Sequence, residues 1–113
     1  MGKIAEAQEY LKESLRITKE IGFVRYIINL CYEYARLYAT QGKIEQAVEL
    51  LALVIQHPTS ELYRMLEGRM QDSAKDLLAK LEGELSQEAF TEAIHRGQLF
   101  VMDAVVADLI EKN

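Results

Sequence analysis

Apolar residues recur three or four positions apart in successive stretches of the chain. The first three stretches cover residues 4–21, 23–40 and 44–56. This spacing places the apolar side chains on one face of an amphipathic helix. No segment shows the sustained alternation that predicts a strand. The pattern therefore predicts an all-α fold. In the third stretch the apolar set is Ile44, Ala47, Val48, Leu51, Val54 and Ile55.

Glycine and proline mark the expected helix ends. Gly22 and Gly42 follow the first two stretches, in the position of a C-terminal cap. His57-Pro58 ends the third, because proline lacks an N–H and disfavours helical geometry in the residue before it. We expect Thr59 or Ser60 to cap a fourth helix that runs to about Leu81, a fifth helix from Ser86 to Gly97, and a sixth over Met102–Glu111. Gly68 inside the fourth suggests a close crossing or a bend.

An internal repeat links the first and third helices. Gly2-Lys3-Ile4 recurs as Gly42-Lys43-Ile44, an offset of 40 residues, and the same offset places Ala7 on Ala47 and Leu11 on Leu51. Self-similarity at a fixed period is typical of stacked helical pairs that cannot bury their apolar faces alone.

The second and third helices resemble the tetratricopeptide repeat (TPR). The resemblance implies antiparallel helix pairs of a TPR-like α-solenoid, with small residues where two helices cross closely. The 40-residue offset is similar to the repeats of large bacterial signal-transducing ATPases and transcription regulators. The matching series is Cys31, Tyr34, Ala35, Tyr38, Gly42, Ile44, Ala47, Leu51, Val54 and Pro58, with Cys31 in place of a bulky residue and Val54 in place of an alanine.

The C-terminal part is similar to the short tail that closes the repeat array in those regulators. Leu85, Glu88-Ala89-Phe90, Ala93 and Gly97 carry this second resemblance. The two resemblances together imply one domain over residues 1–113. Residues 1–58 would form one and a half repeats and residues 59–113 the C-terminal capping helices, either as the end of a larger regulator or as a small relative.

The composition of the chain excludes several classes of protein. The chain has 113 residues, 18 of them acidic and 13 basic, for a net charge of −5. Half of the residues are apolar, which excludes a disordered chain. The acidic balance argues against nucleic acid, whose phosphates require clustered Lys and Arg. No apolar run is long enough for a membrane span, and a lone Cys31 gives no disulfide framework, so we expect a cytoplasmic protein.

The sequence offers little catalytic or metal chemistry. His57 and His95 have no ligand partner at helical spacing, and Cys31 falls within an apolar stripe. The acidic pairs such as Glu45 and Glu49 are interpreted as solvated charges on polar helix faces. We therefore expect no enzyme activity, no cofactor and no metal site.

A candidate partner-binding face lies on the second helix. Asn29, Tyr32, Glu33 and Arg36 project away from the apolar stripe of that helix. Stacked helix pairs present this helix on a concave face, and Tyr and Arg are favoured anchors at protein interfaces. The expected partner is a protein, a peptide or another domain of the same parent chain. Glu33 interrupts the basic clamp with which some TPR proteins bind a C-terminal carboxylate.

Two other functions stay open. The chain could be a purely structural end-cap or oligomerisation domain that makes no other contact. It could also be a DNA-binding helix-turn-helix with its turn near Gly97, although the last helix carries Asp103, Asp108 and Glu111 against Lys112.

The first helix is also a candidate for self-association. It matches the second helix of a repeat whose first helix is missing, so one apolar side would face water. Either the C-terminal helices fold over this side or a second copy of the chain covers it. We expect the C-terminal helices to pack at the other end of the stack, beside Leu51 and Ile55, and therefore a twofold homodimer through the first helix. The residues assigned to this contact are Ile4, Leu11, Leu15 and Ile17.

Overall fold

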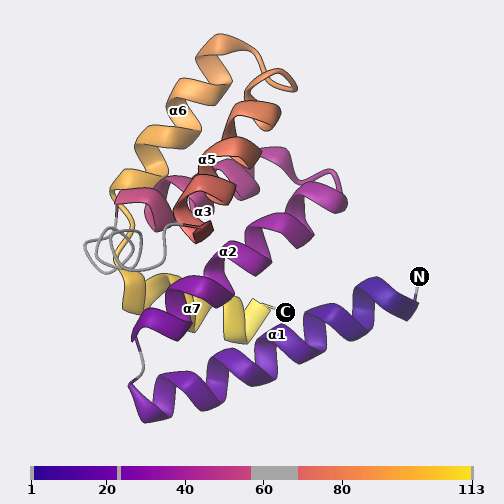
Figure 1. The fold of residues 1–113 in the computed structure, drawn as a ribbon, viewed down its shortest axis with the longest axis vertical. Helices are drawn as coiled ribbons and strands as arrows, with labels where there is room; N and C mark the ends of the chain where they lie inside the picture. Colours follow the sequence, from indigo (N-terminus) through magenta and orange to yellow (C-terminus); the bar gives the residue numbers. More distant parts are fainter. Residues whose placement is uncertain (1, 23, 57–68, 113) are drawn as a thin grey trace.

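The computed structural model describes residues 2–22, 24–56 and 69–112 of the chain, and in them every regular element is a helix. The all-α prediction is confirmed for this part. The predicted cap at Thr59 or Ser60 and the predicted role of Gly68 lie outside the described residues. The helices are α1 (Gly2–Ile21), α2 (Val24–Thr40), α3 (Ile44–Gln56), α5 (Arg69–Glu82), α6 (Gln87–Gln98) and α7 (Met102–Lys112) (Figure 1).

The expected glycine caps are confirmed at the ends of α1 and α2. Gly22 has a φ of 78° and Gly42 a φ of 81°, in the left-handed region that favours glycine. The N–H of Gly22 donates to the carbonyl oxygen of Thr18 at 2.9 Å, so it satisfies an acceptor that the helix end would otherwise leave open. These glycines let the chain reverse direction between α1, α2 and α3.

Helix α3 is the centre of the packing. It contacts α2 on one side and α5 and α6 on others. Because it is surrounded, residues outside the predicted apolar face, such as Leu50, Ala52 and Leu53, are buried as well. A helix that is apolar on nearly all sides is typical of such a central position. None of the described helices has the length and apolar character needed to cross a bilayer.

Helices α3 and α6 approach each other most closely at Gly97. A Cβ atom built on Gly97 would lie 2.2 Å from the carbonyl oxygen of Glu49 and 2.8 Å from the Cβ of Ala52. The predicted end of this helix at Gly97 agrees with the end of α6 at Gln98 to within one residue, but Gly97 lies in the last turn of the helix at the crossing and is not its C-cap, which is Leu99. Position 97 is a glycine because the α3 backbone passes where a side chain would be.

Arg96 ties α6 to α3 beside that crossing. Its Nε donates to Oε2 of Glu49 at 2.7 Å, and its Nη2 donates to Oε1 of Glu45 at 3.0 Å. The hydrogen bond to Glu49 raises the pKa of Arg96, which stays charged. Glu45 is exposed, as the interpretation as a solvated charge predicts, whereas the Glu49 side chain is only 18% exposed; both bind Arg96. Arg96 is more than 40 residues from Glu45 and Glu49 in the sequence, so no local sequence pattern could predict this contact.

The predicted start of α6 is confirmed at Ser86. Its side-chain oxygen accepts a hydrogen bond from the N–H of Ala89 at 3.1 Å, and Glu88 lies in the first turn. Both features stabilise a helix N-terminus, the first by satisfying an open donor and the second by opposing the positive end of the helix dipole.

The last helix returns to the first. Helix α7 contacts α1, with Val106 and Leu109 of α7 in the core, so the C-terminus lies near α1 (Figure 1). The expectation that the C-terminal helices pack at the other end of the stack holds for α6, which contacts α3, and is wrong for α7. The expectation that Leu11 and Leu15 face water is also wrong: Leu11 is 7% exposed and Leu15 is fully buried. Ile17 is exposed, and the side chain of Ile4 lies outside the described residues.

Ala47 allows a direct test of the core around α3. It is fully buried in the cluster formed by α3 and its neighbours. We expect Ala47→Leu to lower the free energy of unfolding by about 1–3 kcal/mol, because added methylenes overfill a packed interior. Urea denaturation measures this. Ala79→Leu on the exposed side of α5 is the control and should change stability by less than about 0.5 kcal/mol. Equal, small effects at both sites would contradict the packing described here.

Candidate functional site

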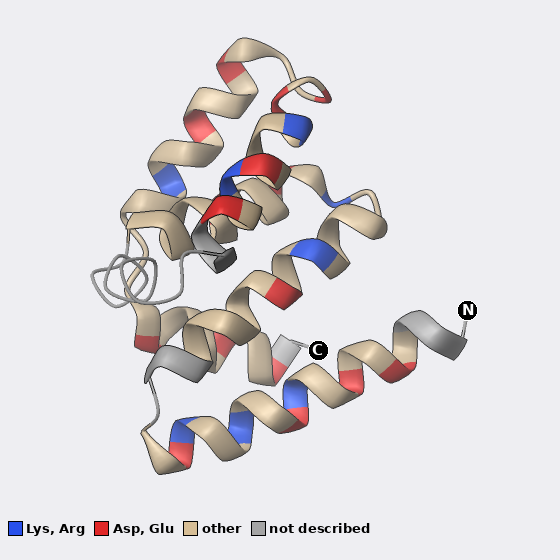
Figure 2. Ribbon diagram, in the orientation of Figure 1, with Lys and Arg blue, Asp and Glu red and all other residues tan. Residues whose placement is uncertain are grey.

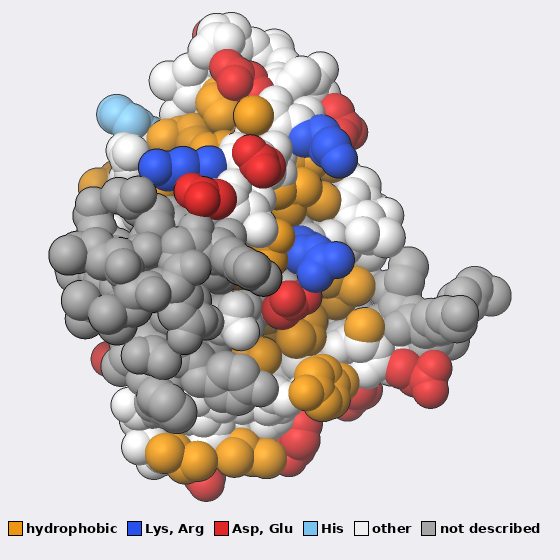
Figure 3. All heavy atoms as spheres, in the orientation of Figure 1, with side chains coloured by type: hydrophobic (Ala, Val, Ile, Leu, Met, Phe, Trp, Pro, Cys, Tyr) orange, Lys and Arg blue, Asp and Glu red, His pale blue; other side chains and the backbone are white. Residues whose placement is uncertain are grey.

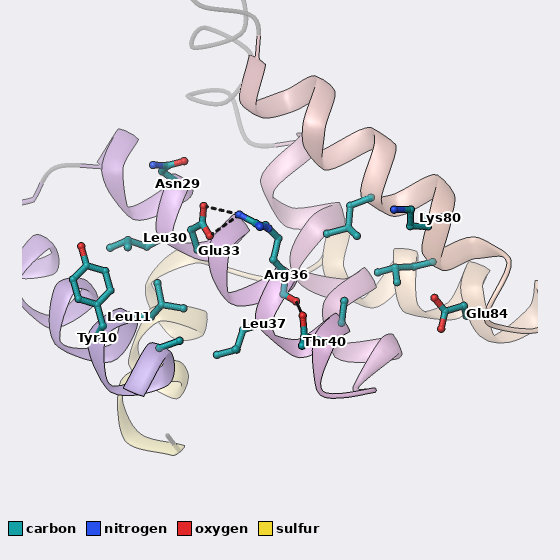
Figure 4. A pocket seen from close by; sticks show the side chains of 14 residues that line it. Tyr10, Leu11, Asn29, Leu30, Glu33, Arg36, Leu37, Thr40, Lys80 and Glu84 are labelled. Atoms are coloured by element: carbon teal, nitrogen blue, oxygen red, sulfur yellow. Dashed lines mark hydrogen bonds and ion pairs between the residues drawn. The ribbon is translucent and has the colours of Figure 1, made fainter. Parts of the chain in front are cut away.

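A groove of about 720 Å³ lies between α1, α2 and α5. Its apolar surface comes from Leu30 and Leu37, which are seven residues apart on α2, and from Leu77 and Leu81, which are four residues apart on α5. Figure 3 shows hydrophobic side chains gathered between these helices, and Figure 4 shows the groove from close by. The lining residues are Ala7, Tyr10, Leu11, Asn29, Leu30, Glu33, Arg36, Leu37, Ala39, Thr40, Leu77, Lys80, Leu81 and Glu84.

Charged side chains border this apolar floor. Arg36 forms an exposed ion pair with Glu33 at 3.2 Å, one helical turn away on α2. Across the groove, Lys80 projects from α5 and Glu84 from the turn that follows it (Figure 4). Among the described residues no ion pair involves Lys80. The borders therefore carry both signs of charge, with Arg36 and Lys80 as the two cations.

The structure brings three of the four predicted partner-binding residues into this groove. Asn29, Glu33 and Arg36 line it, as their shared face on α2 predicts. Tyr32 lies next to it, in a hollow of about 260 Å³ that it shares with Arg36 and Lys80 among others. Tyr32 is half-buried and packs against the core, so its ring is not a free anchor. Arg36 borders both hollows.

Sequence reasoning missed the walls that α1 and α5 contribute. Tyr10 is 65% exposed at the α1 edge of the groove, where Figure 4 shows its ring. Leu77, Lys80 and Leu81 have the spacing of one helix face, and that signal was present in the sequence. What a single sequence lacked was the position of α5 against α2, because residues 57–68 separate α3 from α5 in the chain.

A second hollow of about 670 Å³ lies on α7 and the ends of α2 and α3. Lys43 from the α2–α3 turn lies with its Nζ 5.4 Å from the centre of the Tyr38 ring, a cation–π contact. Val101, Ala104 and Val105 line the opposite side. None of the sequence-predicted site residues is in this hollow.

The chemically reactive candidates lie apart from the groove. Burial raises the pKa of the Cys31 thiol to about 12, so it stays protonated and a poor nucleophile at neutral pH. In the described part of the chain no three His, Cys, Asp or Glu side chains gather where a metal ion could bind. The arrangement in the groove is suited to binding through apolar contact and charge.

The described charges do not form a basic surface. Figure 2 shows basic and acidic residues interspersed over the helices. In α7, the helix that would follow the proposed DNA-binding turn, Asp103, Asp108 and Glu111 are exposed. Comparison of the chain with protein-family models, with curated proteins and with solved structures gives no match.

Proposed function

We propose that the chain is a non-enzymatic interaction module that holds a peptide or helix of a partner protein in the groove between α1, α2 and α5. The observation that carries this proposal is the combination of an apolar floor with charged borders in one hollow of about 720 Å³. Binding sites of this type gain affinity from apolar burial, while a few polar groups fix the orientation of the bound molecule.

The sequence resemblance supports a more specific form of the proposal. In it, the helices form the last TPR-like repeat and cap of a bacterial transcriptional or signalling regulator, in the cytoplasm. The partner is then a separate protein or another domain of the parent chain. Its apolar side chains lie along Leu30, Leu37 and Leu77, and its charged groups meet Arg36 and Lys80 at the borders.

Selection from a library of displayed peptides tests this proposal without a known partner. Peptides selected on the wild-type chain should bind the double variant Arg36→Ala/Lys80→Ala about tenfold more weakly or worse. Both side chains are exposed, so the variant should keep the wild-type melting temperature. Tyr32 is left intact because its packing would confuse binding with stability.

A matched control removes the same charge elsewhere. The variant Arg16→Ala/Lys19→Ala also loses two exposed cations, and Arg16 forms the same kind of one-turn ion pair with Glu13 as Arg36 forms with Glu33. It should bind the selected peptides as the wild type does. Failure to select any binder, or equal losses in both double variants, would contradict the groove proposal and favour a purely structural cap.

A further inference from the structure

The outward face of α1 carries an apolar stripe that the described helices leave open. Tyr10, Ile17 and Ile21 are 65%, 51% and 71% exposed. Tyr10, Ser14, Ile17 and Ile21 follow one another at intervals of four, three and four residues. This is the spacing of the residues that form the seam of a coiled coil. Figure 3 shows hydrophobic side chains exposed at the lower edge of the molecule, where α1 runs. The helix thus presents a second apolar face, beside the one that Leu11 and Leu15 bury.

A row of glutamates runs beside this stripe. Glu6, Glu13 and Glu20 are seven residues apart, so they share one side of the helix, and all three are exposed. Glu13 forms an ion pair with Arg16, three residues further along the helix, and among the described residues no ion pair involves Glu6 or Glu20. Lys12 and Lys19 lie on the side of the helix away from the stripe. The open flank of the stripe is therefore acidic. In a coiled coil, residues in these flanking positions select the partner by charge.

This charge pattern discriminates between possible occupants. A second copy of the chain, packed antiparallel on the same stripe, would set one glutamate row against the other, and opposed like charges are destabilising. An anionic lipid surface would repel the same row. A helix with basic flanking residues matches both the stripe and its charge.

We propose that this face of α1 binds an amphipathic helix of another protein whose apolar seam is flanked by Lys or Arg. The apolar seam of that helix packs on Tyr10, Ile17 and Ile21, and its basic residues pair with Glu6 and Glu20. Apart from Tyr10, which borders both surfaces, the stripe is separate from the groove, so this proposal does not rest on the proposed function.

Two synthetic helical peptides with the same leucine seam provide the probe, one flanked by lysines and the other by glutamates. Fluorescence anisotropy should show that the wild-type chain binds the lysine-flanked peptide at least about tenfold more tightly than the glutamate-flanked one. Glu6→Lys/Glu20→Lys should reverse this preference. Ile17→Ser/Ile21→Ser should weaken binding of the lysine-flanked peptide about tenfold or more.

The control variant Leu99→Ser/Val101→Ser removes two apolar side chains that, like Ile17 and Ile21, are more than half exposed, at 81% and 66%. They lie between α6 and α7, away from the stripe. It should bind as the wild type does, and so should Arg36→Ala/Lys80→Ala, which separates this surface from the groove. Equal binding of the two peptides, or equal loss in the Leu99/Val101 control, would overturn the proposal. So would a dimer in light scattering that Ile17→Ser/Ile21→Ser converts to a monomer, because a second copy would then occupy the stripe.

Discussion

Replacing Gly97 with alanine is expected to lower the free energy of unfolding by about 2–3 kcal/mol, an effect of overpacking. The added Cβ would lie 2.2 Å from the carbonyl oxygen of Glu49, which is backbone and cannot rotate away. Helices α3 and α6 would have to separate, and this would also disturb the contact of Arg96 with Glu45 and Glu49. The direction of the change in stability is informative, because at an ordinary helix position alanine is more stable than glycine by about 1 kcal/mol.

Gly83→Ala is the matched control for this measurement. A Cβ on Gly83 meets only the carbonyl oxygen of Lys80 at 3.7 Å, which is ordinary van der Waals contact. We expect Gly83→Ala to be neutral or slightly stabilising in urea denaturation. Stabilisation of similar size at both positions would show that α6 does not cross α3 at Gly97.

Alkaline solution is expected to destabilise the fold through two buried groups. Burial raises the pKa of the Cys31 thiol from 9.0 to about 12, and burial, with the nearby Tyr38, raises the pKa of Tyr34 from 10.0 to about 12. The unfolded chain therefore releases these protons at lower pH than the folded chain. Their contribution to stability is fully present below about pH 9 and is lost as the pH rises towards 12. For Cys31 the loss is about 3 kcal/mol by about pH 11.

Two variants isolate these contributions. Urea denaturation at about pH 8 and at about pH 11 gives the loss of unfolding free energy between the two pH values. This loss should be about 3 kcal/mol smaller in Cys31→Ala than in the wild type. Tyr34→Phe should reduce the fall by about 1 kcal/mol. The Tyr34 hydroxyl is buried and has no hydrogen-bond partner among the described residues, so its removal should cost little at neutral pH. An unchanged pH dependence in Cys31→Ala would mean that the thiol is accessible to water.

Local sequence patterns predicted the helices well where both ends carry a chemical signal. The expected helix over residues 44–56 agrees with α3 at both ends, because the Gly42 turn precedes it and Pro58 follows it closely. Ser86 likewise marks the start of α6 through its cap. Gly97 was misread because glycine serves both as a helix end and at a close crossing. Only the position of the Glu49 backbone distinguishes these roles.

The candidate site was predictable only in the part that one helix supplies. Asn29, Glu33 and Arg36 share a face of α2, so their spacing was enough to group them. Tyr10 and Lys80 come from α1 and α5, and no local pattern states which helices border α2. The TPR resemblance offered an arrangement, but the solenoid itself remains a prediction.

The apolar faces of α1 also show that a local pattern cannot predict contacts between distant helices. The sequence predicted an exposed apolar side on this helix, and such a side exists. It consists of Tyr10, Ile17 and Ile21, and not of Leu11 and Leu15. Which face is covered depends on the return of α7 to α1, a contact between the two ends of the chain that periodicity within α1 cannot reveal.

Amide chemical-shift mapping with a peptide selected on the wild-type chain tests the central claim most directly. If the groove between α1, α2 and α5 is the binding site, the largest shifts should fall on its borders, at Glu33, Arg36 and Lys80. Largest shifts at Tyr38, Lys43 and Val101, which border the second hollow, would contradict the assignment of the groove as the partner-binding site.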